Sequence, residues 1–169
     1  GLGAGCFQVL EAVLRHAACP VVVDADGITL LSRHMDILRG RTAPTILTPH
    51  EGEFTRLFGP VGPDRMAGAR KAAGESGCIV VLKGHRTCIT DGDKDYVNPT
   101  GNPGMAVGGS GDVLAGIITG LLGQGIDPLE AAALGAWLHG AAGDVCAQEL
   151  GEYGMLPSDL LEVLPRLLK

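Results

Sequence analysis

Several features are missing from this sequence of 169 residues, and each absence argues against a class of protein. No uninterrupted apolar stretch approaches the ~18 residues that a transmembrane helix needs, so no membrane span is predicted. There is no run of like charges and no basic stripe, and the net charge is -6. Nucleic acids and anionic membranes are therefore not expected as partners. The opening Gly1-Leu2-Gly3 does not resemble a signal peptide.

Cysteine motifs are missing as well. The cysteines are odd in number, scattered and without C-x-x-C spacing, which argues against a disulfide framework and a zinc site. We therefore predict a reducing compartment, a cytoplasmic location and no metal site built from cysteine. The five residues concerned are Cys6, Cys19, Cys78, Cys88 and Cys146.

Glycine, by contrast, is abundant. It supplies 27 of the 169 residues, about 16 % against a usual share of roughly 7 %. The excess has no G-X-Y period, which excludes collagen, and a hydrophobic share of 46 % argues against a disordered chain. Nine of the glycines fall in residues 101–125, so we expect the functional site there.

Short apolar runs alternate with helical patterns along the chain. The runs at 20–24, 45–47 and 78–82 are typical of strands buried on both faces of a parallel sheet. Asp91-Gly92 predicts a hairpin between 87–90 and 95–98. Helices are predicted at 3–17, 63–76, 111–123, 127–150 and 156–168, the last interrupted or restarted at Pro165. This alternation predicts one α/β domain over residues 1–169, a three-layer α/β/α sandwich with a mainly parallel central sheet.

The segment after the second strand carries a helix-start signal. Thr48-Pro49-His50-Glu51 is interpreted as a capping box with proline at the first helical position. A helix is therefore predicted directly after the strand at 45–47.

Polar residues follow each predicted parallel strand. Ligands bind beyond the carboxyl ends of the strands in such sheets. Asp24, residues 48–50 and residues 83–87 lie at these ends, and residues 101–112 lead into the next helix. We expect these four segments to meet at one edge of the sheet.

Residues 101–112 form the strongest local signal, Gly-Asn-Pro-Gly-Met-Ala-Val-Gly-Gly-Ser-Gly-Asp. Gly108, Gly109 and Gly111 let the backbone approach a ligand, and with Ser110 they open a helix. Their N–H groups form an anion hole suited to phosphate. Asp112 beside it is suited to taking a proton from an attacking hydroxyl. The alternative is a glycine-rich turn with Asp112 as a plain N-cap.

Gly-Gly-Ser-Gly-Asp opening a helix resembles the phosphoryl-transfer motif of the ribokinase superfamily. Residues 101–112, Thr48-Pro49-His50-x-Gly52-Glu53 and Val81-Leu82-Lys83-Gly84 together resemble one branch closely, the ADP/ATP-dependent NAD(P)H-hydrate dehydratases. Val23-Asp24-Ala25-Asp26 and residues 139–144 also fit. The resemblance covers essentially the whole chain and implies a ribokinase-like fold.

The resemblance implies roles for individual residues. Gly1, His50 and Asp112 contact the hydrated nicotinamide dinucleotide, with Asp112 as the catalytic base. The residues implied to hold the adenine nucleotide are Lys83, Gly84, His85, Arg86 and Thr87, with Gly111 on its phosphate side.

The resemblance also implies the reaction. ADP or ATP, together with Mg²⁺, phosphorylates the hydroxyl of hydrated NADH or NADPH, and loss of phosphate regenerates the reduced nicotinamide. Such an enzyme is a hydro-lyase of metabolite repair. Two alternatives stay open: a small-alcohol (vitamin-precursor) kinase of the same superfamily, and a non-catalytic nucleotide-binding module. The choice between ADP and ATP also stays open.

Two further expectations concern the rest of the protein. The sequence begins inside the Gly-Pro-Gly-Leu-Gly loop of the family, so we expect residues before Gly1 in the natural protein and a domain truncated at its N-terminus. The resemblance implies a homo-oligomer, for which a tetramer is one form, and an epimerase domain or protein as a partner.

Three residues of the predicted helix at 127–150 received separate interpretations. Trp137 is predicted to lie in the core. His139 is interpreted as a hydrogen-bonded core histidine, with a ligand-binding role as the alternative. For Asp144 the sequence leaves open whether it orients a group near the site.

Overall fold

Within residues 5–168, which are the residues that the structure describes, five strands form one sheet. In this computed structural model their spatial order is β1-β2-β3-β4-β5, so each strand lies beside its neighbour in the chain. The strands are β1 (Val21–Val23), β2 (Thr45–Leu47), β3 (Ile79–Leu82), β4 (Cys88–Thr90) and β5 (Asp95–Val97). The helices are α1 (Cys6–His16), α2 (Ala25–Leu31), α3 (Glu51–Phe58), α4 (Arg65–Ser76), α5 (Ser110–Gly123), α6 (Pro128–Leu150) and α7 (Pro157–Leu167), with the 3-10 helices η1 (Met35–Gly40) and η2 (Pro103–Met105).

The sheet is parallel on one side and antiparallel on the other. β1, β2 and β3 run parallel, with Val22 opposite Ile46 and Ile46 opposite Ile79. β4 and β5 pair antiparallel and form the hairpin that Asp91-Gly92 predicts. The three parallel strands and the hairpin are both confirmed.

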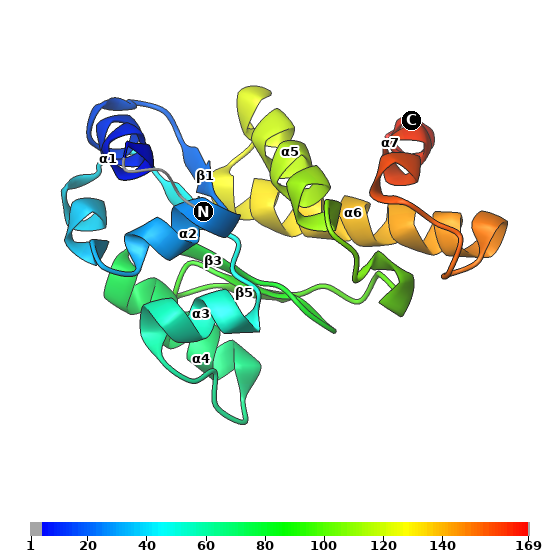
Figure 1. Cartoon of the computed structure of the whole chain (residues 1–169), viewed down its shortest axis with the longest axis horizontal. Helices are drawn as coiled ribbons and strands as arrows, with labels where there is room; N and C mark the ends of the chain where they lie inside the picture. Colours follow the sequence, from blue (N-terminus) through cyan, green and yellow to red (C-terminus); the bar gives the residue numbers. More distant parts are fainter. Residues whose placement is uncertain (1–4, 169) are drawn as a thin grey trace.

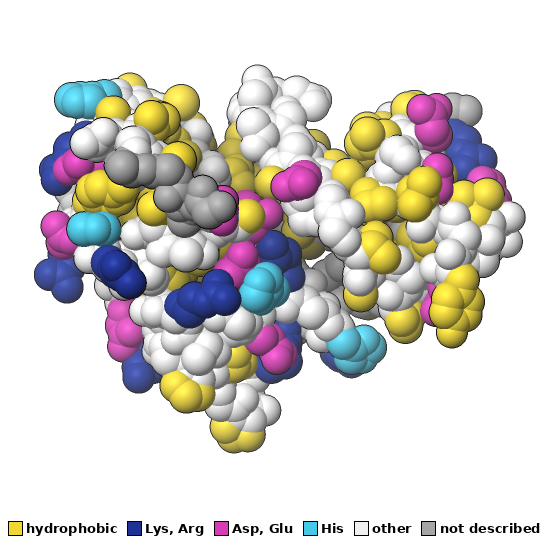
Figure 2. All heavy atoms as spheres, in the orientation of Figure 1, with side chains coloured by type: hydrophobic (Ala, Val, Ile, Leu, Met, Phe, Trp, Pro, Cys, Tyr) yellow, Lys and Arg dark blue, Asp and Glu magenta, His cyan; other side chains and the backbone are white. Residues whose placement is uncertain are grey.

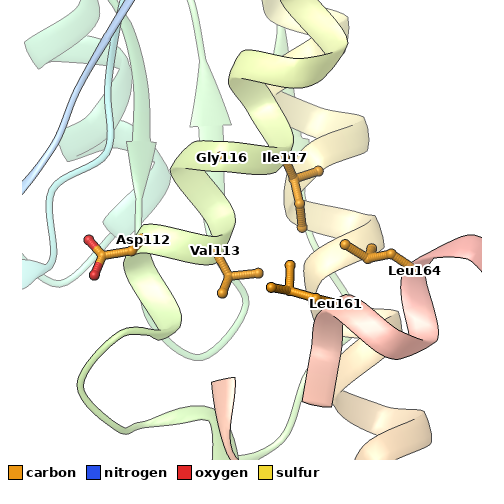
Figure 3. Close-up of a pocket in the computed structure, with 6 residues that line it drawn as sticks. All are labelled: Asp112, Val113, Gly116, Ile117, Leu161 and Leu164. Carbon is orange, nitrogen blue, oxygen red and sulfur yellow. The ribbon is translucent and has the colours of Figure 1, made fainter. Parts of the chain in front are cut away.

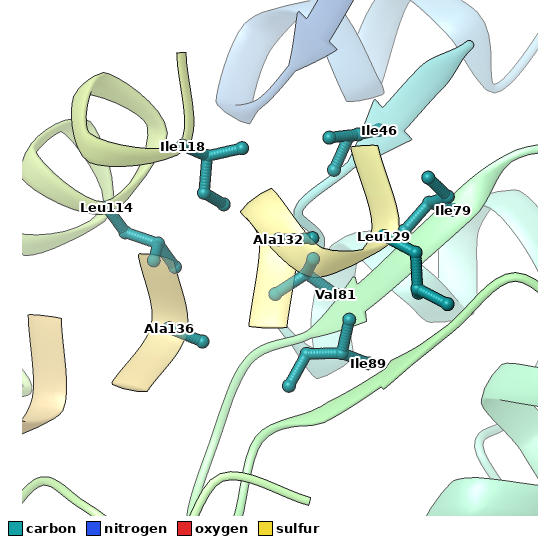
Figure 4. Packing of buried hydrophobic residues seen from close by; sticks show 9 residues of the cluster. All are labelled: Ile46, Ile79, Val81, Ile89, Leu114, Ile118, Leu129, Ala132 and Ala136. Carbon is teal, nitrogen blue, oxygen red and sulfur yellow. The ribbon is translucent and has the colours of Figure 1, made fainter. Parts of the chain in front are cut away.

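Successive residues of the strands face different helix layers. On one face, Ile46, Ile79 and Val81 pack against α5 and α6 (Figure 4). On the other face, Val80 and Leu82 pack against α3 and α4. Adjacent residues of a strand point to opposite faces, so this alternation places helices on both sides of the sheet (Figure 1). The three-layer α/β/α sandwich is confirmed.

Two predictions about the last helices are wrong. α7 runs through Pro165 without interruption, because Leu160 and Val163 are buried in a cluster shared with α6 and hold the helix in place. Trp137 is 42 % exposed, as is Leu134 at 39 % one turn earlier, so this side of α6 faces away from the core. None of the helices described between residues 5 and 168 is long and apolar enough to span a membrane.

Candidate active site

Two charged side chains meet at the carboxyl edge of the parallel strands. Asp24 follows β1, Lys83 follows β3, and Lys83 Nζ lies 2.7 Å from Asp24 Oδ1. Only 20 % of the Lys83 side chain and 13 % of the Asp24 side chain are exposed, and shielding strengthens an ion pair. On the face of the molecule shown in Figure 2, charged side chains of both signs and histidines gather near the middle. The predicted meeting of strand ends is confirmed for these two residues.

A second carboxylate, that of Glu53 in α3, lies close to the same lysine. Its Oε2 is 3.9 Å from Lys83 Nζ and accepts a 2.8 Å hydrogen bond from the His50 backbone N–H. Glu53 is only 6 % exposed, and an acidic residue is rarely buried unless it is paired. The Thr-Pro-His-x-Gly-Glu motif contains Glu53, but sequence reasoning assigned it no function.

His50 is the N-cap of α3. Its Nδ1 accepts hydrogen bonds from the backbone N–H groups of Gly52 and Glu53, at 2.9 and 3.3 Å. The predicted cap at Thr48 is therefore wrong by two residues. The Thr48 N–H donates to the Val23 carbonyl, so Thr48 continues the pairing with β1 and cannot begin a helix.

The capping hydrogen bonds determine which nitrogen of the neutral His50 ring carries the hydrogen. Because Nδ1 is an acceptor, Nε2 carries the hydrogen of the neutral ring. The side chain is 55 % exposed, and Nε2 lies 3.6 Å from Glu53 Oε1.

The glycine-rich segment leads into the N-terminus of α5. Gly109 is the N-cap, with φ of 96°, a left-handed conformation that favours glycine. A Cβ added to Gly111 would lie 3.3 Å from both Asp24 Oδ2 and Lys83 Nζ. The first turn of α5 therefore rests on the ion pair at the sheet edge, and only a residue without a side chain fits there easily.

Asp112 lies in the first turn of α5 and is exposed. Since Gly109 is the N-cap, the alternative that Asp112 is a plain N-cap is wrong. Among residues 5–168 the Asp112 carboxylate has neither a hydrogen-bond partner nor an ion-pair partner. Gly108, just before the cap, is also exposed. A free carboxylate thus stands beside the backbone N–H groups of a helix N-terminus, an arrangement suited to proton removal near a bound anion.

An open depression of about 430 Å³ lies between α5 and α7. Its apolar lining includes Val113 and Ile117 of α5 and Leu161 and Leu164 of α7. The carboxylate of Asp112 points away from these side chains (Figure 3). Asp112 nevertheless belongs to the lining of the depression, so the depression begins beside the first turn of α5.

Asp144 of α6 orients the start of the glycine-rich segment. Its carboxylate oxygens accept hydrogen bonds from the Gly101 N–H at 2.9 Å and from Asn102 Nδ2 at 3.1 Å. The question that the sequence left open for Asp144 is thereby decided in favour of orientation.

His139 of α6 contacts the end of the same segment. Its Nε2 lies 3.2 Å from Ser110 Oγ, so it is hydrogen-bonded, as predicted for a core histidine. Burial lowers the pKa of His139 to about 4, and the nearby positive charge of Lys83 adds to this effect. The ring is therefore neutral at neutral pH.

Residues 83–87 form a loop with strained backbone. Gly84 has φ of 148° and Arg86 has φ of 56°; the latter is unusual for a residue with a side chain, and such strain clusters at functional sites. The Thr87 hydroxyl donates to the Gly84 carbonyl. Arg65 of α4, which sequence reasoning missed, donates to the Lys83 carbonyl at 3.1 Å and so braces this loop from behind.

The predicted site residues are thus distributed in two groups. The structure brings together Asp24, His50, Lys83 and Gly111 through the contacts described above. His85 and Arg86 are exposed and make no side-chain hydrogen bond within the described part of the chain. Gly1 lies outside the described residues.

Comparison with known proteins identifies the family of the chain. The family model described as NAD(P)H-hydrate dehydratase matches residues 1–166. The bifunctional NAD(P)H-hydrate repair enzyme Nnr of Moorella thermoacetica is 48 % identical over 167 residues, covering 96 % of this chain and 32 % of that protein. The chain therefore spans about a third of the length of this relative.

Solved structures share the fold. The ADP/ATP-dependent NAD(P)H-hydrate dehydratase of Bacillus subtilis, co-crystallised with ATP and Mg²⁺, has a TM-score of 0.81 and 37 % identity, over 95 % of this chain and 58 % of that one. A ribokinase-like superfamily protein of Enterococcus faecalis has a TM-score of 0.83 and 35 % identity, over 99 % and 59 %. The fold is therefore ribokinase-like, and the chain belongs to the NAD(P)H-hydrate dehydratase family.

Proposed function

We propose that this chain carries the catalytic machinery for ADP- or ATP-dependent dehydration of hydrated NADH and NADPH. The observation that carries the proposal is the unpaired, exposed carboxylate of Asp112 in the first turn of α5. It stands next to Gly111, which packs on the Lys83–Asp24 ion pair. A module that only bound nucleotide would need no free carboxylate at this position.

In the proposed reaction Asp112 acts as the base. Its carboxylate takes the proton of the ring hydroxyl as the hydroxyl oxygen attacks the terminal phosphoryl group of ADP or ATP. The bond to the leaving AMP or ADP breaks. The resulting phosphate ester then loses inorganic phosphate and a ring proton, which restores the double bond of the reduced nicotinamide. Phosphorylation is needed because hydroxide is a poor leaving group.

The N-terminus of α5 holds the transferred phosphoryl group in this proposal. The backbone N–H groups of Gly108, Gly109 and Gly111 would face a bound anion at the positive end of the helix dipole. The fourth predicted donor, the Ser110 N–H, donates to the Val107 carbonyl at 3.3 Å. Because the three glycine N–H groups are fixed by the fold, they stabilise developing charge without rearrangement.

Mg²⁺ is the proposed ion, and its fit can be tested on the carboxylates present. Asp24 and Glu53 both approach Lys83 Nζ, at 2.7 and 3.9 Å, and Mg²⁺ takes one or two carboxylates plus phosphate oxygens. Within residues 5–168 no group of three or more metal-ligating side chains is present. Asp24, whose Oδ2 is not the oxygen paired with Lys83, and Glu53 would hold Mg²⁺, and the ion would neutralise charge on the phosphates.

The remaining substrate contacts are assigned by the resemblance and by position. The strained loop at 83–87 would hold the adenine nucleotide through its backbone, since the Lys83 ammonium is paired with Asp24. The exposed side chain of His50 would contact the nicotinamide dinucleotide, as would Gly1.

The proposal also covers the cellular location, the oligomeric state and the partner of the enzyme. Free cysteines throughout the described chain favour a reducing, cytoplasmic location. A homo-oligomer, with a tetramer as one form, and an epimerase domain or protein as partner follow from the resemblance. Light scattering on the full-length protein tests the oligomer.

An absorbance assay on the full-length protein tests the activity. Hydrated NADH is incubated with ADP or ATP in parallel, and recovery of NADH is followed together with release of inorganic phosphate. Recovery of both in equal amounts is expected with at least one nucleotide. A stable phosphate ester would instead indicate a small-alcohol kinase, and nucleotide binding without phosphate release would indicate a binding module.

A further inference from the structure

The contact between Ser110 and His139 has no part in the chemistry described so far. It joins the first residue of α5 to the middle of α6, with Ser110 Oγ 3.2 Å from His139 Nε2. Ser110 is only 8 % exposed, so its hydroxyl depends on a partner inside the protein. Within the described residues, His139 is the side chain that provides it.

The same stretch of α6 holds the other end of the glycine-rich segment. Asp144 accepts a hydrogen bond from the Gly101 N–H at 2.9 Å. A Cβ added to Gly140 would lie 2.2 Å from Thr100 Oγ1, so the helix and the segment are in direct contact. Helix α6 therefore contacts the glycine-rich segment at both ends: Asp144 holds the start of the segment, and His139 holds its end.

The neutral His139 ring suits this task. Its low pKa leaves one N–H group and one lone pair on the ring, so either tautomer offers the Ser110 hydroxyl a partner. A neutral ring also adds no repulsion to Lys83, which lies close to Gly111.

We propose that His139 is a positioning residue: by holding Ser110 it fixes the first turn of α5, and with it the N–H groups of Gly109 and Gly111, at the phosphoryl group. The inference rests on the proposed function, and it assigns His139 no contact with substrate. Small displacements of a positioned group are costly in catalysis. The loss should therefore appear in turnover and in ADP binding, and the KM for the dinucleotide should stay nearly constant.

Kinetics of variants in the full-length protein test the proposal. His139→Leu is expected to lower kcat about tenfold and to weaken ADP binding several-fold, with the KM for hydrated NADH changed by less than about twofold. His139→Gln, whose amide nitrogen lies near the position of Nε2, is expected to restore most of the loss. The double variant with Ser110→Ala should be no worse than the poorer single variant, because both changes remove one contact.

Leu138→Ala serves as the matched control. Leu138 is the neighbouring residue of α6, 2 % exposed, and packs in a separate apolar cluster with Leu121. The control should lower the melting temperature and leave kcat near that of the wild type when assayed below its transition.

The outcomes separate the inference from the proposed function. Equal kcat and equal ADP binding in His139→Leu and wild type would overturn the inference, as would an equal loss of kcat in Leu138→Ala. A wild type that binds ADP but lacks dehydratase activity would overturn the proposed function. Calorimetry would then still decide the role of His139, since weaker ADP binding in His139→Leu than in Leu138→Ala supports it and equal binding refutes it.

Discussion

Lys83 Nζ and Asp24 Oδ1 lie 2.7 Å apart, and the first turn of α5 approaches both of them at Gly111. Three segments that are far apart in the sequence therefore meet at one ion pair: two of them supply its charges, and α5 packs against it. Because the pair is largely shielded from solvent, its removal should affect both stability and the site.

Lys83→Met should destabilise the protein. The substitution keeps an unbranched stem of similar length but leaves the Asp24 carboxylate shielded and unpaired. The free energy of unfolding is expected to fall by about 1–3 kcal/mol, measured by urea denaturation. Adding Asp24→Asn to the same chain should recover part of this loss, since no unpaired charge then remains at Asp24. An unchanged urea midpoint in Lys83→Met would contradict the prediction.

Asp112→Ala should abolish turnover while the fold persists. Loss of the base is expected to lower kcat by about 10²-fold or more, with ADP affinity changed by less than about twofold. The melting temperature should fall by only a few degrees, because the exposed carboxylate loses no side-chain partner among the described residues and only its interaction with the helix dipole, worth ~0.3–1 kcal/mol. Asp93→Ala, which removes an exposed carboxylate in the β4–β5 turn, is the control. Activity retained in Asp112→Ala would refute the assignment of the base.

Two glycines of α5 should respond in opposite ways to alanine. A Cβ at Gly111 would crowd Asp24 Oδ2 and Lys83 Nζ at 3.3 Å, whereas a Cβ at Gly120 meets nothing within 4 Å. Gly111→Ala should lower kcat/KM for ADP about tenfold. Gly120→Ala should leave activity unchanged and stabilise the helix by about 0.5–1 kcal/mol. Steady-state kinetics and thermal melting of both variants give the comparison, and equal kinetics for the two would argue against close packing at Gly111.

Thiol labelling should separate two classes of cysteine. Cys6 and Cys19 are exposed, whereas Cys78 is buried, and burial raises the pKa of the Cys78 thiol to about 11. At pH 8 only about one Cys78 thiol in a thousand is ionised, and the thiolate is the reactive form. Iodoacetamide is therefore expected to modify Cys6 and Cys19 in the native protein and all five cysteines in urea. Mass spectrometry measures this, and native labelling of Cys78 as fast as Cys19 would contradict it.

Local patterns predicted the architecture well. The apolar runs at 45–47 and 78–82 are strands and Asp91-Gly92 is the hairpin turn, because their signals lie within a few neighbouring residues. The short helix α2 was missed because seven residues are too few for a clear periodicity.

The sequence predicted which chain segments form the candidate site, but it did not predict the side-chain contacts between them. Capping chemistry suggested Thr48, but pairing with β1 occupies Thr48 and moves the cap to His50. The approach of Glu53 to Lys83 and the bracing by Arg65 join residues that only the folded chain brings together. Such contacts leave no periodic trace in the sequence.

The order of the sheet bears on how the protein assembles during synthesis. Among the described strands, each of β2 to β5 pairs with the strand made just before it, so this part of the sheet can grow as the chain emerges from the ribosome. His139 and Asp144 of α6, which hold the glycine-rich segment, are synthesised only after that segment. We therefore expect the nucleotide end of the site to be completed late, so that ADP binding reports a chain whose sheet has already formed.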